Sequence, residues 1–225
     1  MSGLAIFDLD GTMLDTLPDI AASVNRARKR LSLPPLPVEA ISAAIGNGQR
    51  TLVERTISDP GCDVSFEERL AIQKEEYSRG LHDLTRPYPG VAETLRRLRE
   101  AGWKTAALSN KGDADTKDIL AYVGWSPFFD FVQGAAPGIP LKPDPAVIDL
   151  AIRATGFPGP RGDVWMVGDN YTDLEAARRA GIRRCFCRYG YGNPRGETWD
   201  LAVDSIAEWA DAVLVRPQAP VSGTH

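Results

Sequence analysis

Two patterns of hydrophobic and polar residues divide the chain. The apolar run Leu4-Ala5-Ile6-Phe7 predicts a buried strand near the start. Between residues 17 and 81, apolar residues recur with the 3.6-residue period of a helix, and no strand pattern interrupts them. From residue 86 onward, short apolar runs alternate with helical patterns. Because strands that alternate with helices are typical of βαβ units, we predict a parallel α/β sheet with a helical segment inserted after its first strand.

Breaks in these patterns predict the separate elements. In the helical segment, Thr16 is expected to cap a first helix that Pro34 ends. Two shorter helices follow, around Ile41 and Val53, and Ser65 begins a capping box that opens a fourth. In the second part of the chain, apolar runs predict strands at residues 105–108, 128–132, 164–167 and 184–187.

Polar residues follow three of the predicted strands where each strand ends. Asp8-Leu9-Asp10-Gly11-Thr12 follows the first, and Gly11 permits a sharp turn there. Ser109-Asn110-Lys111 follows the strand at 105–108, and Gly168-Asp169 with Asp173 follows the strand at 164–167. Lys142 lies in a loop that Pro143 and a second proline stiffen. Since parallel sheets bind ligands outside the carboxyl ends of their strands, we expect these side chains to converge.

The converging residue types suit phosphate chemistry. Carboxylates beside a substrate phosphate are the ligands that Mg²⁺ prefers, and lysine, hydroxyl and backbone N–H groups suit phosphate oxygens. One carboxylate can accept a phosphoryl group while another acts as a general acid and base. The sequence therefore predicts phosphoryl transfer at this edge of the sheet.

Composition narrows the class of protein. The 225 residues carry a net charge of −4, which gives no electrostatic footprint for nucleic acid or an anionic membrane. No apolar run reaches the roughly 18 residues that suggest a membrane span. The chain contains three cysteines and opens without a signal-peptide pattern, so we expect a cytoplasmic protein with reduced thiols. Residues 216–225, rich in Pro, Ser and Gly, are expected to form a disordered tail.

The four motifs, in this order along the chain, resemble the haloacid dehalogenase superfamily of phosphotransferases. The matching positions are Asp8 to Thr12, Ser109, Lys142, and Gly168-Asp169 with Asp173. The resemblance implies a Rossmann-like, doubly wound parallel sheet with an inserted helical cap. It assigns residues 1–14 and 88–215 to the α/β core domain and residues 15–87 to the cap. Residues 11–17 and 84–89 would then be the hinges of a cap that moves for substrate entry.

The resemblance also implies a role for each motif residue. Asp8 would be the nucleophile, and Asp10 would protonate the leaving oxygen and then activate water. An oxygen of Asp8, the main-chain carbonyl of Asp10 and Asp169 would hold Mg²⁺, with Asp173 in support. The transferring phosphoryl oxygens would be held by Ser109, the main-chain N–H of Asn110, and Lys142. Thr12 would also belong to the phosphate-binding residues and would help to place the loop that carries Asp10.

A narrower resemblance concerns the substrate. The loop Gly46-Asn47-Gly48, together with the motifs around Ser109 and Tyr189, is similar to phosphoglycolate phosphatases. The resemblance implies that this loop reaches the active site and helps to choose the substrate, with 2-phosphoglycolate the best single guess. Arg50 and Arg55 are candidates for binding a carboxylate.

Several alternatives stay open at this point. The protein could hydrolyse another sugar phosphate or a nucleotide, act as a phosphomutase, or be a catalytically silent binding module. A dehalogenase needs no acid two residues after the nucleophile, so Asp10 argues against that activity. The expected partner is a small phosphate ester, and a monomer and a homodimer are both compatible with the sequence.

Overall fold

The structure is a computed structural model that describes residues 3–60 and 62–214. The predicted tail at 216–225 lies outside the described residues, as does the last residue of the predicted core domain. Within the part of the chain that is described, no helix is both long and apolar enough to span a membrane.

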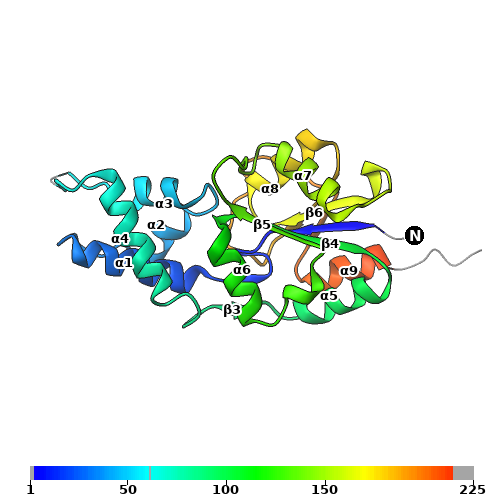
Figure 1. Ribbon diagram of the computed structural model, residues 1–225, viewed down its shortest axis with the longest axis horizontal. Helices are drawn as coiled ribbons and strands as arrows, with labels where there is room; N and C mark the ends of the chain where they lie inside the picture. Colours follow the sequence, from blue (N-terminus) through cyan, green and yellow to red (C-terminus); the bar gives the residue numbers. More distant parts are fainter. Residues whose placement is uncertain (1–2, 61, 215–225) are drawn as a thin grey trace, which may run out of the picture.

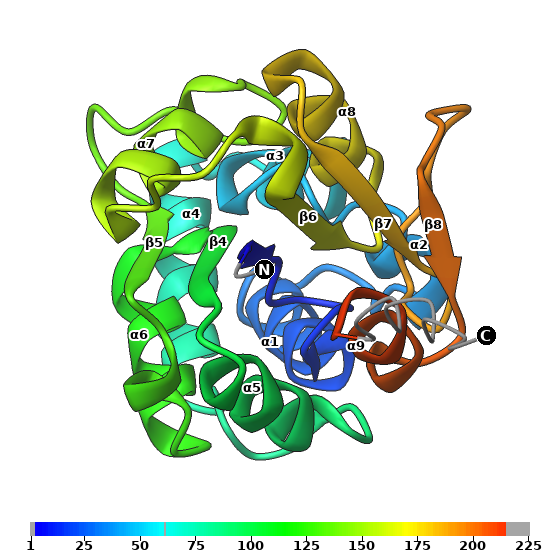
Figure 2. The same ribbon diagram turned by 90° about the vertical axis from the view of Figure 1, so that its right-hand side faces the viewer.

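Six parallel strands form the main sheet, in the order β5-β4-β1-β6-β7-β8 (Figure 2). The strands are β1 (Leu4–Phe7), β4 (Lys104–Gly112), β5 (Phe131–Ala135), β6 (Val164–Gly168), β7 (Arg183–Cys187) and β8 (Leu201–Val203). β1 lies between β4 and β6, so the polar residues that follow these three strands meet at one edge. The predicted parallel α/β fold is confirmed.

Helices cover both faces of the sheet (Figure 2). One face packs on α5 (Val91–Glu100), α6 (Asp113–Tyr122) and α9 (Ile206–Leu214), and the other on α7 (Ala146–Thr155) and α8 (Tyr171–Ala180). Successive strand residues point to opposite faces, so Ala5 and Phe7 join the first layer, and Leu4 and Ile6 join the second. Full burial of β1 explains why its sequence is continuously apolar rather than alternating. Two short 3₁₀ turns, Ser126–Phe128 and Arg161–Asp163, complete the connections.

Two predicted strands have different bounds in the structure. The strand expected at 105–108 continues as β4 to Gly112, with an irregular register after Leu108, so Ser109 to Lys111 belong to the strand itself. The strand expected at 128–132 begins only at Phe131, because residues 126–128 form a 3₁₀ turn. Apolar residues packed in a turn are indistinguishable from a buried strand by pattern alone.

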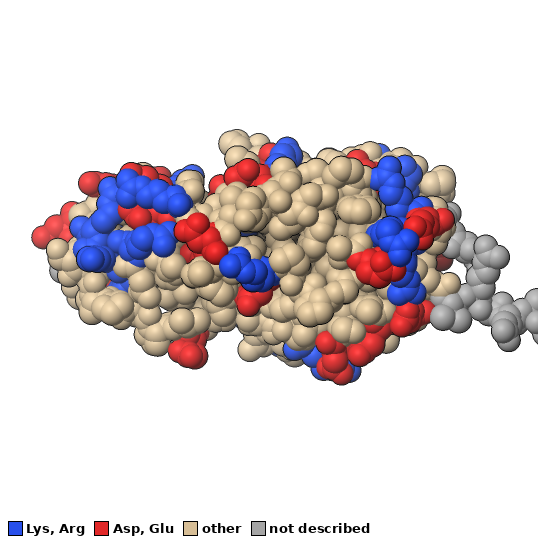
Figure 3. Space-filling model, turned by 90° about the horizontal axis from the view of Figure 1, so that it is seen from below, with Lys and Arg blue, Asp and Glu red and all other residues tan. Residues whose placement is uncertain are grey.

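The inserted segment forms four helices that lie beside the sheet at one end of the molecule (Figure 1). They are α1 (Leu17–Arg30), α2 (Val38–Ser42), α3 (Gln49–Thr56) and α4 (Phe66–Ser78). This helical bundle has an apolar cluster of its own, formed by Ala27, Val53, Ile57 and Leu70. Where α1 meets α4, Arg26 and Arg30 pair with the buried Glu76. Figure 3 shows a group of Lys and Arg side chains on the bundle, with Asp and Glu side chains around it.

Two chain crossings join the bundle to the sheet. β2 (Leu14–Asp15) and β3 (Arg86–Pro87) pair as a small antiparallel ribbon that the hydrophobic pattern did not predict, because both strands have only two residues. The buried carboxylate of Asp19 accepts hydrogen bonds from the backbone N–H groups of Leu84 and Thr85. The crossings therefore brace each other, and the second of them is the more exposed.

Candidate active site

The turn after β1 places Asp8 at the centre of the sheet edge. Its backbone N–H donates to Val167 O of β6, which continues the ladder one residue past the strand. The chain then turns at Gly11, whose φ of +79° favours glycine. A Cβ at this position would lie 2.1 Å from Asp169 Oδ2, so the close approach of the turn to Asp169 also requires glycine.

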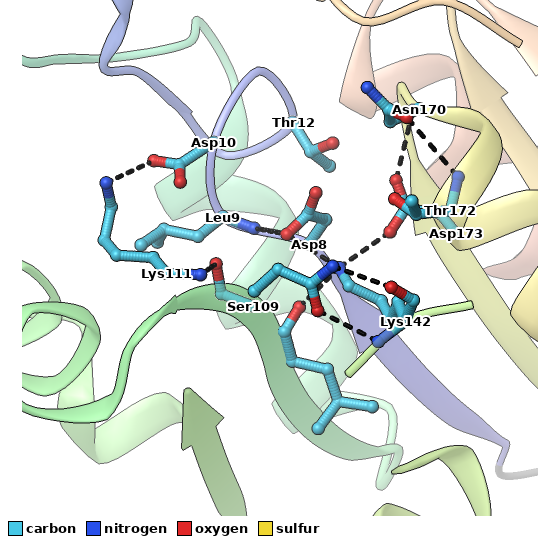
Figure 4. A network of polar contacts seen from close by, with 12 residues as sticks. Asp8, Leu9, Asp10, Thr12, Ser109, Lys111, Lys142, Asn170, Thr172 and Asp173 are labelled. Atoms are coloured by element: carbon cyan, nitrogen blue, oxygen red, sulfur yellow. Dashed lines mark hydrogen bonds and ion pairs between the residues drawn. The ribbon is translucent and has the colours of Figure 1, made fainter. Parts of the chain in front are cut away.

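Three buried carboxylates meet beside this turn. Oxygen atoms of Asp8, Asp169 and Asp173 lie within 4.8 Å of one another. Lys142 Nζ lies 2.8 Å from Asp8 Oδ1 and 2.7 Å from Asp173 Oδ1, and it donates to Leu108 O at 2.8 Å (Figure 4). The lysine thus enters the cluster with all three of its N–H donors engaged.

The electrostatics of the cluster favour a further cation. Burial, and next the neighbouring Asp173, raise the pKa of Asp8 to about 7, although Lys142 opposes the shift. Burial and the charge of Asp8 also raise the pKa of Asp169 well above its usual range. Carboxylates with raised pKa values gain most from a bound cation, because it favours their ionised form. Three hard oxygen donors at this spacing fit Mg²⁺.

Asp10 points away from this cluster. Thr16 Oγ1 donates to Asp10 Oδ1 at 2.6 Å, and Lys111 Nζ lies 3.1 Å from the same oxygen. Figure 4 shows Asp10 and Lys111 on one side of Asp8, with Lys142 and Asp173 on the other. Thr16 occupies the predicted N-cap of α1, yet its hydroxyl makes no cap hydrogen bond because it is bonded to Asp10 instead.

The other predicted phosphate-binding residues lie around Asp8. Ser109 is buried, and its hydroxyl accepts a hydrogen bond from the backbone N–H of Lys111. The Asn110 side chain accepts from Lys142 N and donates to Lys142 O, which fixes the loop that carries the lysine. Thr12 Oγ1 donates to Asp169 Oδ1 at 3.3 Å, so Thr12 contacts Asp169 rather than the side chain of Asp10.

The loop after β7 contributes to the site more than its sequence suggested. Gly192 N donates to Asp169 Oδ2 at 2.7 Å. A Cβ at Gly190 or Gly192 would lie 2.4 or 2.6 Å from atoms of Asp169, so both glycines leave room for that residue. The hydroxyl of Tyr191 lies 2.8 Å from Thr16 Oγ1. The signal in the sequence was the pair Gly190 and Gly192, which follows β7, the strand beside β6.

A cavity lies between the sheet edge and the helical bundle. The sheet side contributes Asp8, Asp10, Ser109, Asn110, Lys111, Gly112, Asp115, Lys142, Asp169, Asn170 and Tyr191. The bundle side contributes Ile20, Ile45, Gly46, Gly48, Gln49, Leu52, Gln73 and Tyr77. All the predicted site residues of the sheet edge except Thr12 and Asp173 therefore border one space. Thr12 contacts Asp169 and Asp173 contacts Lys142 from behind.

The predicted substrate loop reaches the site, but its asparagine does not line the cavity. Asn47 Nδ2 donates to the hydroxyl of Tyr171 at the start of α8, at 2.5 Å. Gly46 O accepts from Asn110 Nδ2 at 2.8 Å. The two candidates for carboxylate binding are engaged elsewhere, since Arg50 pairs with Glu67 and Arg55 donates to Asn47 Oδ1.

Comparisons with known proteins agree with this geometry. The family model described as haloacid dehalogenase-like hydrolase matches residues 5–187. A phosphoglycolate phosphatase of Caulobacter vibrioides is 34% identical over 228 residues, which cover 96% of this chain and 94% of the relative. One from Pseudomonas putida is 34% identical over 211 residues, covering 90% and 76%. The crystal structure of a predicted phosphoglycolate phosphatase from Haemophilus somnus 129pt superposes with a TM-score of 0.84 at 28% identity, covering 94% of this chain and 96% of that one.

The family match covers most of the chain, and the motif residues lie together at the sheet edge. The predicted family and the predicted enzyme class are thereby confirmed: this chain belongs to the haloacid dehalogenase-like hydrolases.

Proposed function

We propose that this hydrolase is a Mg²⁺-dependent phosphatase that cleaves a small phosphomonoester, with 2-phosphoglycolate as the leading substrate, through an aspartyl-phosphate. The observation that carries the proposal is the placement of Asp8. It lies between Lys142 on one side and Asp10 on the other, at the base of a cavity. The phosphoglycolate phosphatases among its relatives support the choice of substrate.

Asp8 is the proposed nucleophile. Its Oδ1 is held by the backbone N–H of Leu9 at 2.7 Å and by Lys142 at 2.8 Å. These contacts fix the carboxylate and leave Oδ2 to attack the phosphorus atom. As the new bond to phosphorus forms, the ester bond breaks, and Asp10 donates its proton to the leaving oxygen.

The second half of the reaction uses the same residues. Asp10, now ionised, takes a proton from water, and the water oxygen attacks the phosphorus atom of the aspartyl-phosphate. The bond between phosphorus and Asp8 breaks, which releases phosphate and restores the carboxylate. Lys142 and Ser109, with the backbone N–H of Asn110, balance the charge on the phosphoryl oxygens in both steps.

The acidic cluster is the proposed metal site. Asp8 and Asp169 would hold Mg²⁺ together with the main-chain carbonyl of Asp10, and Asp173 would hold Lys142 in place. When bound, Mg²⁺ neutralises charge on the phosphoryl group and screens the carboxylates from one another. We further propose that residues 15–87 act as a cap, because the bundle supplies the roof of the cavity.

The proposal is tested with a panel of phosphomonoesters that includes 2-phosphoglycolate, a sugar phosphate and a nucleotide. We expect hydrolysis to require Mg²⁺ and kcat to fall by at least about 10³-fold in Asp8→Asn, while Asp63→Asn, a change at an exposed residue of the bundle, leaves it unaltered. Turnover in EDTA would refute the metal assignment, and an inert panel would refute the phosphatase.

Metal binding has a readout apart from activity. Mg²⁺ at 100 times its Kd should stabilise the fold by about 2.7 kcal/mol, which for a chain of this size raises the unfolding midpoint by several degrees. We expect Asp169→Asn to lose most of that shift.

A further inference from the structure

The cavity has one cationic side chain that the proposed mechanism does not use. Of the described residues that line it, Lys142 and Lys111 are the two with a positive charge. Lys142 spends its three donors on Asp8, Asp173 and Leu108 O. Lys111 comes from the irregular end of β4, and its side chain is only 6% exposed.

Lys111 is held from two sides and keeps one donor for a ligand. Its Nζ donates to the hydroxyl of Tyr77 on α4 at 2.6 Å and lies 3.1 Å from Asp10 Oδ1. An ammonium group has three N–H donors, so these two contacts aim the side chain and leave the third donor.

Lys111 lies near the place where the leaving oxygen of the substrate would bind. Asp10 donates its proton to the leaving oxygen, and the ammonium group of Lys111 is bonded to the same carboxyl group. A cation in that place can reach an anionic group that is joined to the leaving oxygen through a single carbon. Among the described residues, the bundle brings no second cation to the cavity. Its side chains there are those of Ile20, Ile45 and Leu52 and of the uncharged Gln49, Gln73 and Tyr77.

We propose that Lys111, aimed by Tyr77, binds the carboxylate of the substrate and so makes the enzyme selective for short phosphorylated hydroxy acids. This inference rests on the proposed phosphatase activity, and it assigns to Lys111 the role that the sequence suggested for Arg50 or Arg55. Both arginines are bonded to other residues, outside the cavity lining.

The test compares two substrates that differ only in the carboxylate. 2-Phosphoglycolate carries it, and ethyl phosphate has a methyl group in its place. A hydrogen bond to a charged group contributes about 1.5–3 kcal/mol. We therefore expect Lys111→Met to lower kcat/KM for 2-phosphoglycolate by about 10- to 100-fold more than for ethyl phosphate. Lys117→Met, which removes an exposed lysine of α6, is the matched control and should change neither value.

The outcomes separate this inference from the activity on which it rests. An equal loss on both substrates would mean that Lys111 only positions Asp10, and would overturn the inference while the phosphatase stands. A wild-type enzyme without preference between the two substrates would overturn it as well. A wild-type enzyme that cleaves neither would refute the activity itself.

A second variant covers the case in which Lys111→Met does not fold. Tyr77→Phe keeps the ring in the core and removes the hydroxyl that aims Lys111. It should lower kcat/KM for 2-phosphoglycolate by several-fold more than the value for ethyl phosphate. An unchanged preference in Tyr77→Phe would count against the inference.

Discussion

Asp10 is positioned by residues that come from three different parts of the chain. Thr16 precedes α1, and Lys111 lies near the end of β4. Tyr191 follows β7 and contacts the Thr16 hydroxyl. A general acid must be placed within hydrogen-bond reach of the oxygen that it protonates. The hydrogen bond from Thr16 is the shortest of these contacts to Asp10, so we expect it to matter most for the proton transfer.

Removing this hydroxyl should slow the chemical step. In Thr16→Val, we expect kcat to fall by about 10-fold or more, because a hydrogen bond to a charged group contributes about 1.5–3 kcal/mol. KM should change little, because Thr16 is not among the residues that line the cavity. The same change at Thr155, a buried residue of α7 far along the chain, provides the control. A Thr16→Val enzyme that turns over like the wild type would show that Asp10 is positioned without it.

The sequence predicts some of these residues better than others. We expected Asp8 and Asp169 to converge because each follows a strand whose carboxyl end lies at the same edge of the sheet. We expected Lys142 to reach the same edge from its loop. The structure brings the three side chains together. The contact of Lys111 with Tyr77 was not predicted, because the two lie on different elements and nothing local in the sequence pairs them.

At the scale of single elements, hydrogen bonds hold the loop Gly46-Asn47-Gly48 of the bundle against α8 and β4. One contact runs from Asn47 to Tyr171 of α8, and another from Asn110 of β4 to Gly46 O. A role of Asn47 in choosing the substrate stays a prediction, and its bond to Tyr171 favours a different one: holding the loop over the cavity.

Removing the hydrogen bond between Asn47 and Tyr171 should speed amide hydrogen exchange in the loop alone. In Tyr171→Phe, we expect amide hydrogen exchange at residues 46–48 to be faster by about 2- to 10-fold, which corresponds to a hydrogen bond worth about 0.5–1.5 kcal/mol. Exchange in β6 should be unchanged. Tyr122→Phe alters a tyrosine that is 63% exposed on α6 and serves as the control. Unaltered exchange at 46–48 would mean that the bond to Asn47 does not restrain the loop.

Element bounds were predicted well where periodicity is long and poorly where it is short. The four helices of the bundle and the buried strands followed from their patterns. The ribbon of β2 and β3 did not, because two-residue strands leave no periodic signal. The extension of β4 into Ser109 to Lys111 was missed because polar residues were expected to end the strand.

At the scale of the molecule, the sheet edge and the helical bundle have different proposed roles. The sheet edge carries the groups that we propose to react, and the bundle covers them (Figure 1). The α/β class and the inserted helices could be predicted because both depend on repeated patterns. The cavity could not, since it arises from the packing of the bundle on the sheet. The cytoplasmic location stays a prediction.

The central claim is that a phosphoryl group passes through Asp8. The most direct measurement is a single turnover with radiolabelled substrate, quenched in acid within milliseconds and followed by peptide mapping. We predict a transient protein-bound phosphate on the peptide that contains Asp8, and none in Asp8→Asn. Turnover without any protein-bound phosphate, or a label on another residue, would contradict the account.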